Sequence, residues 1–247
     1  MRRRATGRGT GRAAAWVAAA VVLGGLATGC DIAAEPGSQS PGGGPAGPAP
    51  AMVAPGPPGS ARALLAELPV RGRAAKTGYD RAEFGSAWAD SDHNGCDTRD
   101  DVLARDLAGE TFRPGTHRCV VLTGRLADPY TGQAIAFSKA QASAVQVDHV
   151  VALSDAWQKG AARWPDSLRQ QFANDPLNLL AVDGPANQAK GDGDAATWLP
   201  PAKSYRCRYV ARQVAVKAKY RLWVTPAERD AMARVLARCP AEPAPVS

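Results

Sequence analysis

Three polar residues in the middle of this chain have the types and order that phosphodiester hydrolysis requires. Asp148 and His149 are adjacent within Val145–Val151, a run whose β-branched residues predict a strand. Asn187 follows His149 by 38 residues. The whole chain has only three histidines, so His149 has few rivals for a role in proton transfer. These three residues could supply one site with both a general base and the ligands of a metal ion.

Hydrolysis of a phosphodiester needs a base for the attacking water and a cation for the charge that builds on the phosphate. Histidine titrates near neutral pH, which makes His149 the candidate base. A hard cation takes oxygen ligands and keeps several waters, so Asp148 and Asn187 would suffice to hold it. Neighbours on a strand point to opposite faces, so Asp148 and His149 serve one site only where the strand ends or twists. Asn178 could orient the histidine region.

The competing interpretation is purely structural. His149 would then be a buried core histidine, and Asn178 and Asn187 would be turn and cap residues. The sequence order of the three residues does not by itself decide between the two interpretations.

A mixed set of elements must position these residues. The hydrophobic pattern predicts strands at 119–122, 135–137, 145–151 and 178–182. It predicts helices at 61–68, 98–107, 153–172 with a break at Trp164-Pro165, from Pro185 onward, at 206–222 and at 226–238. Thr225 and Glu228 form a capping-box pattern for the last helix. Because strands and helices do not alternate, the predicted fold class is α+β.

The motifs together resemble a known family. Asp148-His149-Val-Val, Asn178-Leu-Leu and Asn187-Gln-Ala-Lys190 follow the order seen in HNH (His-Me finger) endonucleases. The chain looks most like exported HNH endonuclease-family proteins, whose domain is similar to the nuclease part of GmrSD-type modification-dependent restriction enzymes. The flanking segments that share the resemblance are Asn94–Arg99, Asp128–Gly132, Asp175–Asn178 and Trp198–Pro201, so it covers about residues 76–240.

The resemblance implies a ββα-metal core inside a mainly helical single domain, with a role for each motif residue. Asp148 would be a metal ligand, His149 the general base and Asn178 the central asparagine that orients the loop. Asn187 would be the last metal ligand, and Lys190 would approach a phosphate. The chain departs from the family where Asn187 stands in place of a histidine; an amide oxygen favours Mg²⁺, with Mn²⁺ as the second choice.

Arg99 is a further candidate for substrate binding. Its guanidinium could form a bidentate contact with a substrate phosphate. A salt bridge to a neighbouring acidic residue such as Asp100 or Asp106 is an equally good interpretation.

The five cysteines indicate an exported protein. Cys30 follows Leu26-Ala-Thr-Gly29 and fits a bacterial lipobox, which leaves Cys96, Cys119, Cys207 and Cys239. Four cysteines in an exported domain predict two disulfides, and three pairings are open. Cys96–Cys119 and Cys207–Cys239 are favoured because each would close a compact local element. A zinc site is disfavoured, since none of the four stands in a C-x-x-C pair.

The N-terminus has the pattern of a secretory signal, with five arginines in twelve residues before an apolar run. We expect a lipoprotein signal peptide at 1–29 and a Pro/Gly-rich tether at 30–60. A nuclease domain at 61–240 and a disordered tail at 241–247 would follow. A lipid on Cys30 would hold the protein on the outer face of the cell membrane. Without the lipid the chain would be secreted, or anchored by an uncleaved signal.

Charge is unevenly distributed along the chain. The formal net charge is +7, but five of these charges belong to the signal region. Residues 184–240 carry 11 basic and 4 acidic side chains, whereas residues 31–183 carry 14 basic and 18 acidic ones. A basic region beside the Asp148–His149 segment would suit a polyanion, although a solvated helix surface explains it equally well.

The sequence thus predicts a metal-dependent endonuclease that acts on nucleic acid, DNA in the first place, outside the cytoplasm. The alternative is a non-catalytic envelope lipoprotein of the same fold that binds nucleic acid or another polymer. A peptidase is disfavoured, because the chain lacks G-x-S-x-G and has too few histidines for a zinc site. No protein partner can be inferred.

Overall fold

A computed structural model describes residues 56–246. The predicted signal peptide, the lipidation residue Cys30 and most of the predicted tether lie outside the described residues. In the described part, none of the helices combines the length and the apolar character that crossing a membrane requires.

The described residues form an α+β fold, which confirms the predicted class. The helices are α1 (Ala61–Glu67), α2 (Thr98–Asp106), α3 (Leu153–Trp157), α4 (Asp166–Ala173), α5 (Gly184–Lys190), α6 (Arg206–Lys219) and α7 (Pro226–Leu236). Short 3₁₀ turns cover Arg81–Phe84, Lys139–Gln141, Ala161–Arg163 and Lys203–Tyr205. The strands are β1 (Leu107–Phe112), β2 (Val121–Ala127), β3 (Ala134–Ser138), β4 (Val145–His149) and β5 (Leu179–Asp183).

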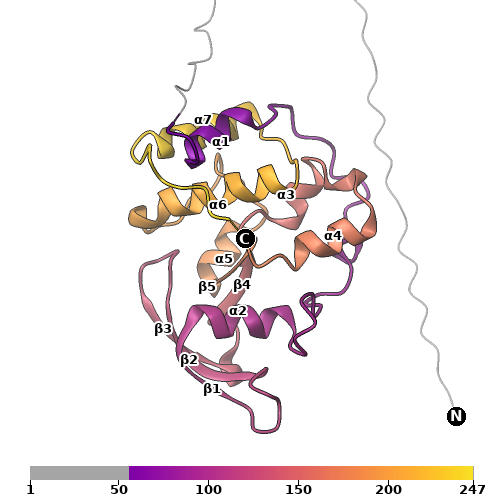
Figure 1. Ribbon diagram of the computed structural model, residues 1–247, viewed down its shortest axis with the longest axis vertical. Helices are drawn as coiled ribbons and strands as arrows, with labels where there is room; N and C mark the ends of the chain where they lie inside the picture. The colour runs from indigo at the N-terminus through magenta and orange to yellow at the C-terminus, as the bar shows by residue number, and fades with distance from the viewer. Residues whose placement is uncertain (1–55, 247) are drawn as a thin grey trace, which may run out of the picture. The chain divides into compact units, whose positions relative to one another are not determined.

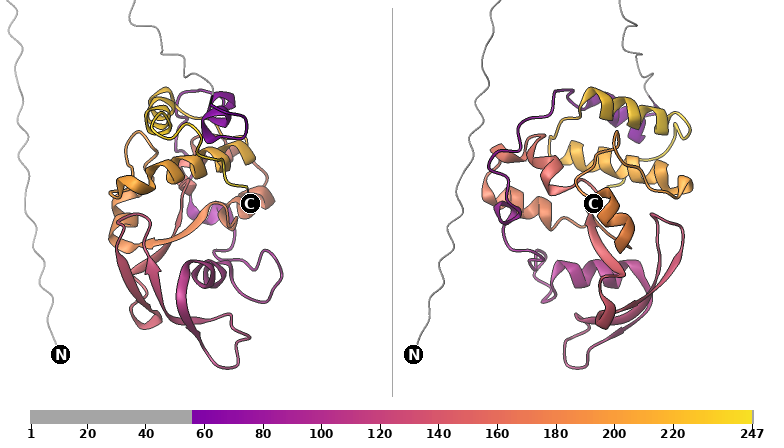
Figure 2. Two further views of the ribbon diagram at one scale, coloured as in Figure 1. Left: turned by 60° about the vertical axis from the view of Figure 1, so that its left-hand side comes forward. Right: turned by 180° about the vertical axis from the view of Figure 1, so that it is seen from behind.

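The strands form two separate antiparallel sheets. β1, β2 and β3 make a three-stranded sheet, and β4 pairs with β5. The sequence pattern did not predict β1, whose residues Leu107–Phe112 alternate poorly between apolar and polar. Helices α1, α6 and α7 gather at one end, and α2 with the three-stranded sheet lies at the other (Figures 1 and 2). The β4–β5 pair and α5 lie between these two groups, so they contact both.

The β4–β5–α5 unit is the ββα arrangement that the resemblance implies. In the β4–β5 register His149 faces Leu179 and Asp148 faces Leu180. Asp183 ends β5 and caps α5, since its carboxylate accepts a hydrogen bond from the Ala186 amide at 2.8 Å. The helix therefore begins directly where the strand ends, which fixes α5 against β4.

Helix capping follows the sequence closely at the C-terminal end. Thr225 accepts a hydrogen bond from the Glu228 amide at 3.2 Å, and the Glu228 carboxylate accepts one from the Thr225 amide at 3.3 Å. This confirms the predicted capping box at the start of α7.

Both favoured disulfides are present. Cys96 pairs with Cys119, and Cys207 pairs with Cys239. The first joins the loop before α2 to the β1–β2 loop, and the second joins α6 to the end of α7.

The tail after Pro240 forms backbone hydrogen bonds with the start of the described chain. The carbonyl of Glu242 accepts a hydrogen bond from the Ala61 amide at 2.8 Å, and the Ala244 amide donates to Gly59 at 3.2 Å. These bonds pair the tail with the chain just before α1. Composition could not reveal this, because the partner backbone groups are more than 180 residues away in sequence.

Candidate active site

A cavity of about 570 Å³ lies where β4 ends, and it brings together several of the residues that the sequence singles out. His149, Asp148, Asn187 and Arg99 are all on its wall. The other polar and aromatic side chains of the wall come from the segment before α2, from β4, from α3 and from the end of α5: Lys76, Tyr79, Arg81, Trp88, Gln146, Ser154, Gln188 and Asp192.

His149 is the last residue of β4, and its imidazole is almost completely buried. Nε2 lies 2.8 Å from the carbonyl oxygen of Ala173. Because a carbonyl can only accept, Nε2 carries the proton and Nδ1 is left as the acceptor nitrogen. Burial lowers the pKa of His149 to about 3, so the ring is neutral at physiological pH. A neutral imidazole with a fixed tautomer leaves Nδ1 free to accept a proton, although a pKa of about 3 lies well below the near-neutral range in which a general base is most efficient.

Trp88 stacks on this imidazole, which the sequence analysis missed. The two ring centroids are 6.0 Å apart, and the planes differ by 16°. Trp88 has a φ of 59°, a left-handed conformation that is rare for bulky residues. The Ala89 amide donates to Asn174 Oδ1 at 2.9 Å, and Thr98 Oγ1 donates to the Ala89 carbonyl. These bonds hold the backbone at the position where the indole covers His149.

Asp148 points to the other side of β4 and is also buried. Tyr130 Oη donates to Asp148 Oδ2 at 2.6 Å, and Lys190 Nζ donates to Asp148 Oδ1 at 3.0 Å. Burial raises the pKa of Asp148, and the charge of Lys190 and the Tyr130 hydroxyl oppose that rise. Burial, with the Asp148 charge, raises the pKa of Tyr130, so its hydroxyl stays a donor. The sequence analysis included Tyr130 only within the flanking segment Asp128–Gly132 and gave it no role.

Lys190 lies elsewhere than the sequence analysis expects. Its side chain is 0% exposed, and the ammonium also donates to the His149 carbonyl at 2.9 Å. The approach to phosphate that the resemblance implies is therefore not seen in this structure. Lys190 instead serves as the buried counter-ion of Asp148 and ties α5 to the end of β4.

Asn187 lies one turn before Lys190 on α5 and faces the cavity. Its Nδ2 donates to Gln146 Oε1 at 2.9 Å, which commits the nitrogen and leaves Oδ1 as the free-standing acceptor end of the amide. Gln146 precedes Asp148 by two residues on β4, so the two side chains share a face of the strand. Within residues 56–246, no group of three or more His, Cys, Asp or Glu side chains is arranged to hold a metal ion.

The donor set nevertheless fits a hard cation that keeps most of its water. Each carboxylate oxygen of Asp148 has two lone pairs, and Tyr130 and Lys190 each use one. The His149 amide is a further donor to this carboxylate, so one acceptor position remains on it, and both Asp148 and Asn187 belong to the cavity lining. The Lys190 ammonium opposes a second cation here, so an ion must share or displace it.

Asn178 is buried in the loop before β5 and bridges to the chain after His149. Its Oδ1 accepts from the Val151 amide at 2.8 Å, and its Nδ2 donates to the Val151 carbonyl at 3.2 Å. Its own carbonyl accepts from the Val150 amide at 2.8 Å. Asn178 thus fixes the backbone that leaves β4, which is the place where the strand must end for His149 to reach the cavity.

Three cationic side chains line the cavity, of which the sequence analysis named only Arg99. Lys76 and Arg81 come from the segment that crosses the surface before α2. Lys76 Nζ pairs with Asp192 at 3.1 Å, and both groups are more than half exposed. The three cations line the cavity together with a single exposed carboxylate, so the cavity is suited to an anionic group.

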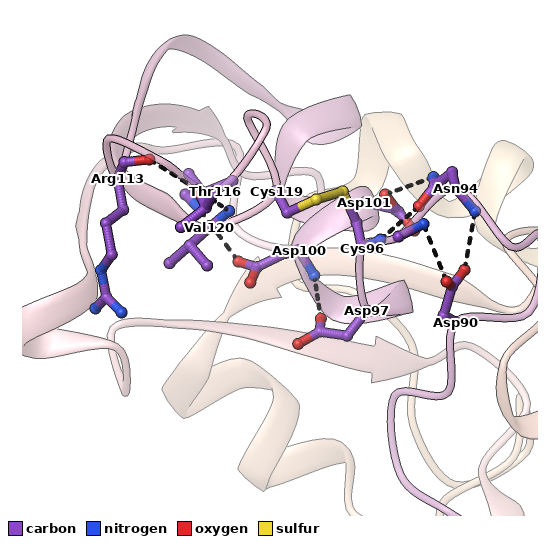
Figure 3. The surroundings of a disulfide bond; sticks show 12 residues. Asp90, Asn94, Cys96, Asp97, Asp100, Asp101, Arg113, Thr116, Cys119 and Val120 are labelled. Atoms are coloured by element: carbon purple, nitrogen blue, oxygen red, sulfur yellow. Dashed lines mark hydrogen bonds between the residues drawn. A yellow bond between two sulfur atoms is a disulfide. The ribbon is translucent and has the colours of Figure 1, made fainter.

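The Cys96–Cys119 disulfide (Figure 3) lies directly before α2, the helix whose second residue is Arg99. Asp97 caps α2 by accepting from the Asp100 amide at 2.7 Å, and Asp100 Oδ1 accepts from the Val121 amide at 3.3 Å. The start of α2, which carries Arg99, is therefore held by a disulfide from the preceding loop to the β1–β2 loop and by one hydrogen bond to β2.

A buried ion network stands behind the cavity. Lys159 Nζ lies 2.6 Å from Asp155, 2.8 Å from Asp194 and 2.6 Å from Glu228. Lys217 Nζ pairs with Asp155 at 3.1 Å and with Glu228 at 2.9 Å. The network joins α3, α6 and α7 to the loop after α5, which carries Asp192 to the cavity wall.

Comparison with known proteins identifies the class of protein. The family model described as "GmrSD restriction endonucleases, C-terminal domain" matches residues 97–235, more than half of the chain. The chain belongs to this nuclease-related family, and the match contains the β4–β5–α5 unit with its candidate site.

A curated relative extends the similarity to most of the chain. It is 40% identical over 196 residues, which cover 78% of this chain and 92% of the relative. The relative is named an uncharacterized secreted protein of Arthroderma benhamiae. No solved structure matches this chain.

Proposed function

We propose that this protein is an HNH-type endonuclease that hydrolyses the phosphodiester bonds of nucleic acid, DNA in the first place. One observation carries the proposal: a neutral, buried His149 shares a cavity with Asp148, Asn187 and three cationic side chains. Membership in the GmrSD nuclease-related family supports the reaction class.

His149 is the proposed general base. Nε2 donates to the Ala173 carbonyl, so Nδ1 accepts the proton of the water that attacks phosphorus. Trp88 stacks on the ring and shields it from bulk water. A positioned base contributes about 10²- to 10⁴-fold to the rate.

Arg81, Arg99 and Lys76 are the proposed phosphate contacts. Guanidinium groups match the oxygens of a phosphate in a bidentate way, and an ammonium adds a point charge. These charges in the cavity that His149 lines would hold the scissile phosphate within reach of the base.

Asp148 and Asn187 are the proposed ligands of a divalent cation, Mg²⁺ in the first place and Mn²⁺ in the second. When bound there, such an ion supplies charge stabilisation to the phosphate and the leaving oxygen. Tyr130 and Gln146 hold the two ligands by hydrogen bonds of 2.6 and 2.9 Å, which is the usual task of residues behind a metal ligand.

Asn178 is the proposed positioning residue for the base. Its bridge to Val151 holds the chain after β4, and it does not itself need to contact the substrate.

We further propose that the protein acts outside the cytoplasm. Two disulfides suit an oxidising compartment, and the curated relative is named a secreted protein. A lipid on Cys30 would tether it to the outer face of the membrane, and the unlipidated chain would be secreted.

Plasmid nicking by the purified protein with Mg²⁺, with Mn²⁺ and with EDTA tests the proposal. His149→Asn keeps a polar side chain but cannot act as a base near neutral pH, so nicking should fall about 10²- to 10⁴-fold. His117→Asn is the matched control. His117 is exposed and has a φ of 49°, a conformation that asparagine tolerates, so this variant should nick like the wild type.

The outcomes separate the competing functions. Metal-dependent nicking that only His149→Asn abolishes supports the nuclease and its base together. Nicking by His149→Asn at the wild-type rate contradicts the role of His149. A folded, oxidised protein that nicks with neither metal favours the non-catalytic binding protein.

A further inference from the structure

We propose that the hollow between α6 and α7 is a second binding site, which holds the phosphate backbone of a nucleic-acid substrate outside the catalytic cavity. The inference rests on the proposed function for the identity of the polyanion. Four cationic residues define this hollow, which we call the basic groove: Lys203, Arg206, Arg234 and Arg238.

The basic groove has an apolar floor and a cationic rim. Its volume is about 280 Å³. The residues other than the four cations are Ala195, Ala196, Leu199, Cys207, Ala231 and Val235. None of these is aromatic or acidic, so the groove offers charge but no ring on which a base could stack. Contacts of this kind hold a backbone without reading its sequence.

The charges of the basic groove are not neutralised. None of the four cations forms an ion pair with a carboxylate in the part of the chain that the structure describes. Lys203, Arg234 and Arg238 are exposed. Arg206 is half-buried, and its Nε donates to the Pro200 carbonyl at 2.8 Å, which fixes the guanidinium but leaves its terminal nitrogens available. The buried Arg169, in contrast, faces the carboxylates of Glu83 and Asp166.

The Cys207–Cys239 disulfide makes the groove rigid. It joins the residue after Arg206 to the residue after Arg238, so the two cations are held in register across the hollow. Arg234 precedes Arg238 by four residues, and Arg238 lies two residues beyond the end of α7. Figure 1 shows α6 and α7 side by side, as do the views in Figure 2. Cations that are fixed before binding lose less entropy when they contact phosphates.

One short segment links the basic groove to the catalytic cavity. Gly191 and Asp192 belong to the cavity wall, and Ala195, Ala196 and Leu199 belong to the groove wall. Only a few residues therefore separate the two walls along the chain. A polyanion that extends beyond the cavity can reach the groove, whereas a small phosphorylated molecule would occupy only one of them.

The test is the salt dependence of binding to a labelled DNA duplex of about 40 base pairs, measured in EDTA so that hydrolysis does not interfere. The variant is Arg234→Gln/Arg238→Gln, which changes two exposed side chains. The control is Arg113→Gln/Arg163→Gln, which removes the same charge from two exposed arginines outside all the cavities described. An RNA duplex of the same sequence and vesicles of phosphatidylglycerol are measured in parallel.

If the basic groove binds phosphates, the groove variant should change the slope of log K against log salt as well as the affinity. Each lost phosphate contact lowers the slope of log K against log salt by about 0.9, so the groove variant should lose about 2 and the control much less. Under hydrolysis conditions the groove variant should raise KM for the long duplex at unchanged kcat. A duplex of about one helical turn should not discriminate between the variants.

Equal slopes for the groove variant and the control would overturn the inference. So would a loss of vesicle binding with nucleic-acid binding unchanged, which would make the groove a membrane-facing surface. Failure of the proposed function is a separate result. It appears as absence of nicking by the wild type, whereas the slope in EDTA measures the groove alone.

Discussion

The ammonium of Lys190 lies 3.0 Å from a carboxylate oxygen of Asp148, and both groups are buried. Asp148 is also the proposed metal ligand, so the ammonium occupies one of the positions where a divalent cation would neutralise the same carboxylate. Lys190 and the metal are therefore expected to be alternative or shared counter-ions of Asp148.

The first prediction follows from that competition. Lys190→Gln leaves the buried Asp148 without its cation, and breaking a buried pair costs about 3–5 kcal/mol of unfolding free energy. Mg²⁺ should restore part of that loss, because the ion can then take the place of the ammonium. Thermal unfolding in EDTA and in Mg²⁺ measures both effects.

Lys76→Gln is the matched control, because Lys76 pairs with Asp192 where both groups are more than half exposed. Its loss should stay within about 1 kcal/mol. An equal Mg²⁺-induced rise in Tm for wild type, Lys190→Gln and Lys76→Gln would contradict the shared role of Asp148.

The second prediction concerns the cationic wall of the cavity. Arg99→Gln should raise KM about tenfold, which corresponds to about 1.4 kcal/mol, with a smaller effect on kcat. Arg81→Gln should act in the same direction. Arg163→Gln, an exposed substitution elsewhere, should leave KM unchanged. Steady-state cleavage of a short duplex is the measurement, since it does not involve the basic groove. A kcat loss without a change in KM would place Arg99 at the reacting atoms instead.

The sequence predicts much of the fold, because local patterns determine most of it. Thr225 and Glu228 predict the start of α7, and Pro185 predicts the start of α5. The cysteine spacing favours the pairs that form. Asp148, His149 and Asn187 all belong to the lining of one cavity, because β4, β5 and α5 lie within residues 145–190, although Asp148 and His149 point to opposite sides of β4.

The residues that the sequence analysis did not single out have contacts that join parts of the chain distant in sequence. Trp88 stacks on a residue 61 positions later, and Tyr130 donates to Asp148 across 18 positions. A lysine in a sequence usually indicates a surface position, but Lys159 and Lys217 of the buried network are completely buried. Periodicity describes one element at a time, so it cannot reveal which elements meet.

The third prediction concerns Trp88. Trp88→Gly removes the indole from His149 but suits the positive φ of 59°, so the backbone should tolerate it. Nicking should fall because the imidazole loses its cover and its fixed orientation. Trp164→Gly is an unsuitable control, since Trp164 packs against Phe172 in the core. Trp88→Phe is better, because it keeps a ring at the stacking position and should retain most of the activity. Equal activity of the glycine and phenylalanine variants would contradict a role for the stack.

The fourth prediction concerns the disulfide beside Arg99. Cys96→Ser/Cys119→Ser opens a loop whose ends are 23 residues apart, which costs about 3–4 kcal/mol in unfolding free energy. Urea unfolding measures this loss. The Cys207→Ser/Cys239→Ser variant should lose a similar amount, because its loop spans 32 residues. Only the second variant should also weaken binding at the basic groove, and a weakening in both would assign the effect to general loosening.

The last prediction is that His149 causes a loss of stability on mild acidification. Burial holds the pKa of folded His149 at about 3, whereas the unfolded residue titrates near 6.5. The unfolded state therefore binds a proton that the folded state does not, so stability falls as pH drops from 6.5 toward 3. Between pH 7 and pH 5 the expected loss is about 2 kcal/mol.

Buried carboxylates act in a lower window and allow the two effects to be separated. Although burial alone would raise the pKa values of Asp155 and Asp194, the lysines beside them lower both overall. Their contribution is therefore complete above about pH 4 and is lost below it. Urea unfolding at pH 7, 5 and 3 should show that His149→Asn removes the loss between pH 7 and 5 but not the loss below pH 4. His117→Asn should behave as the wild type in both windows. If His149→Asn loses as much stability between pH 7 and 5 as the wild type does, the imidazole of the wild type is solvated. That result would remove the basis for proposing that His149 stays neutral over this pH range.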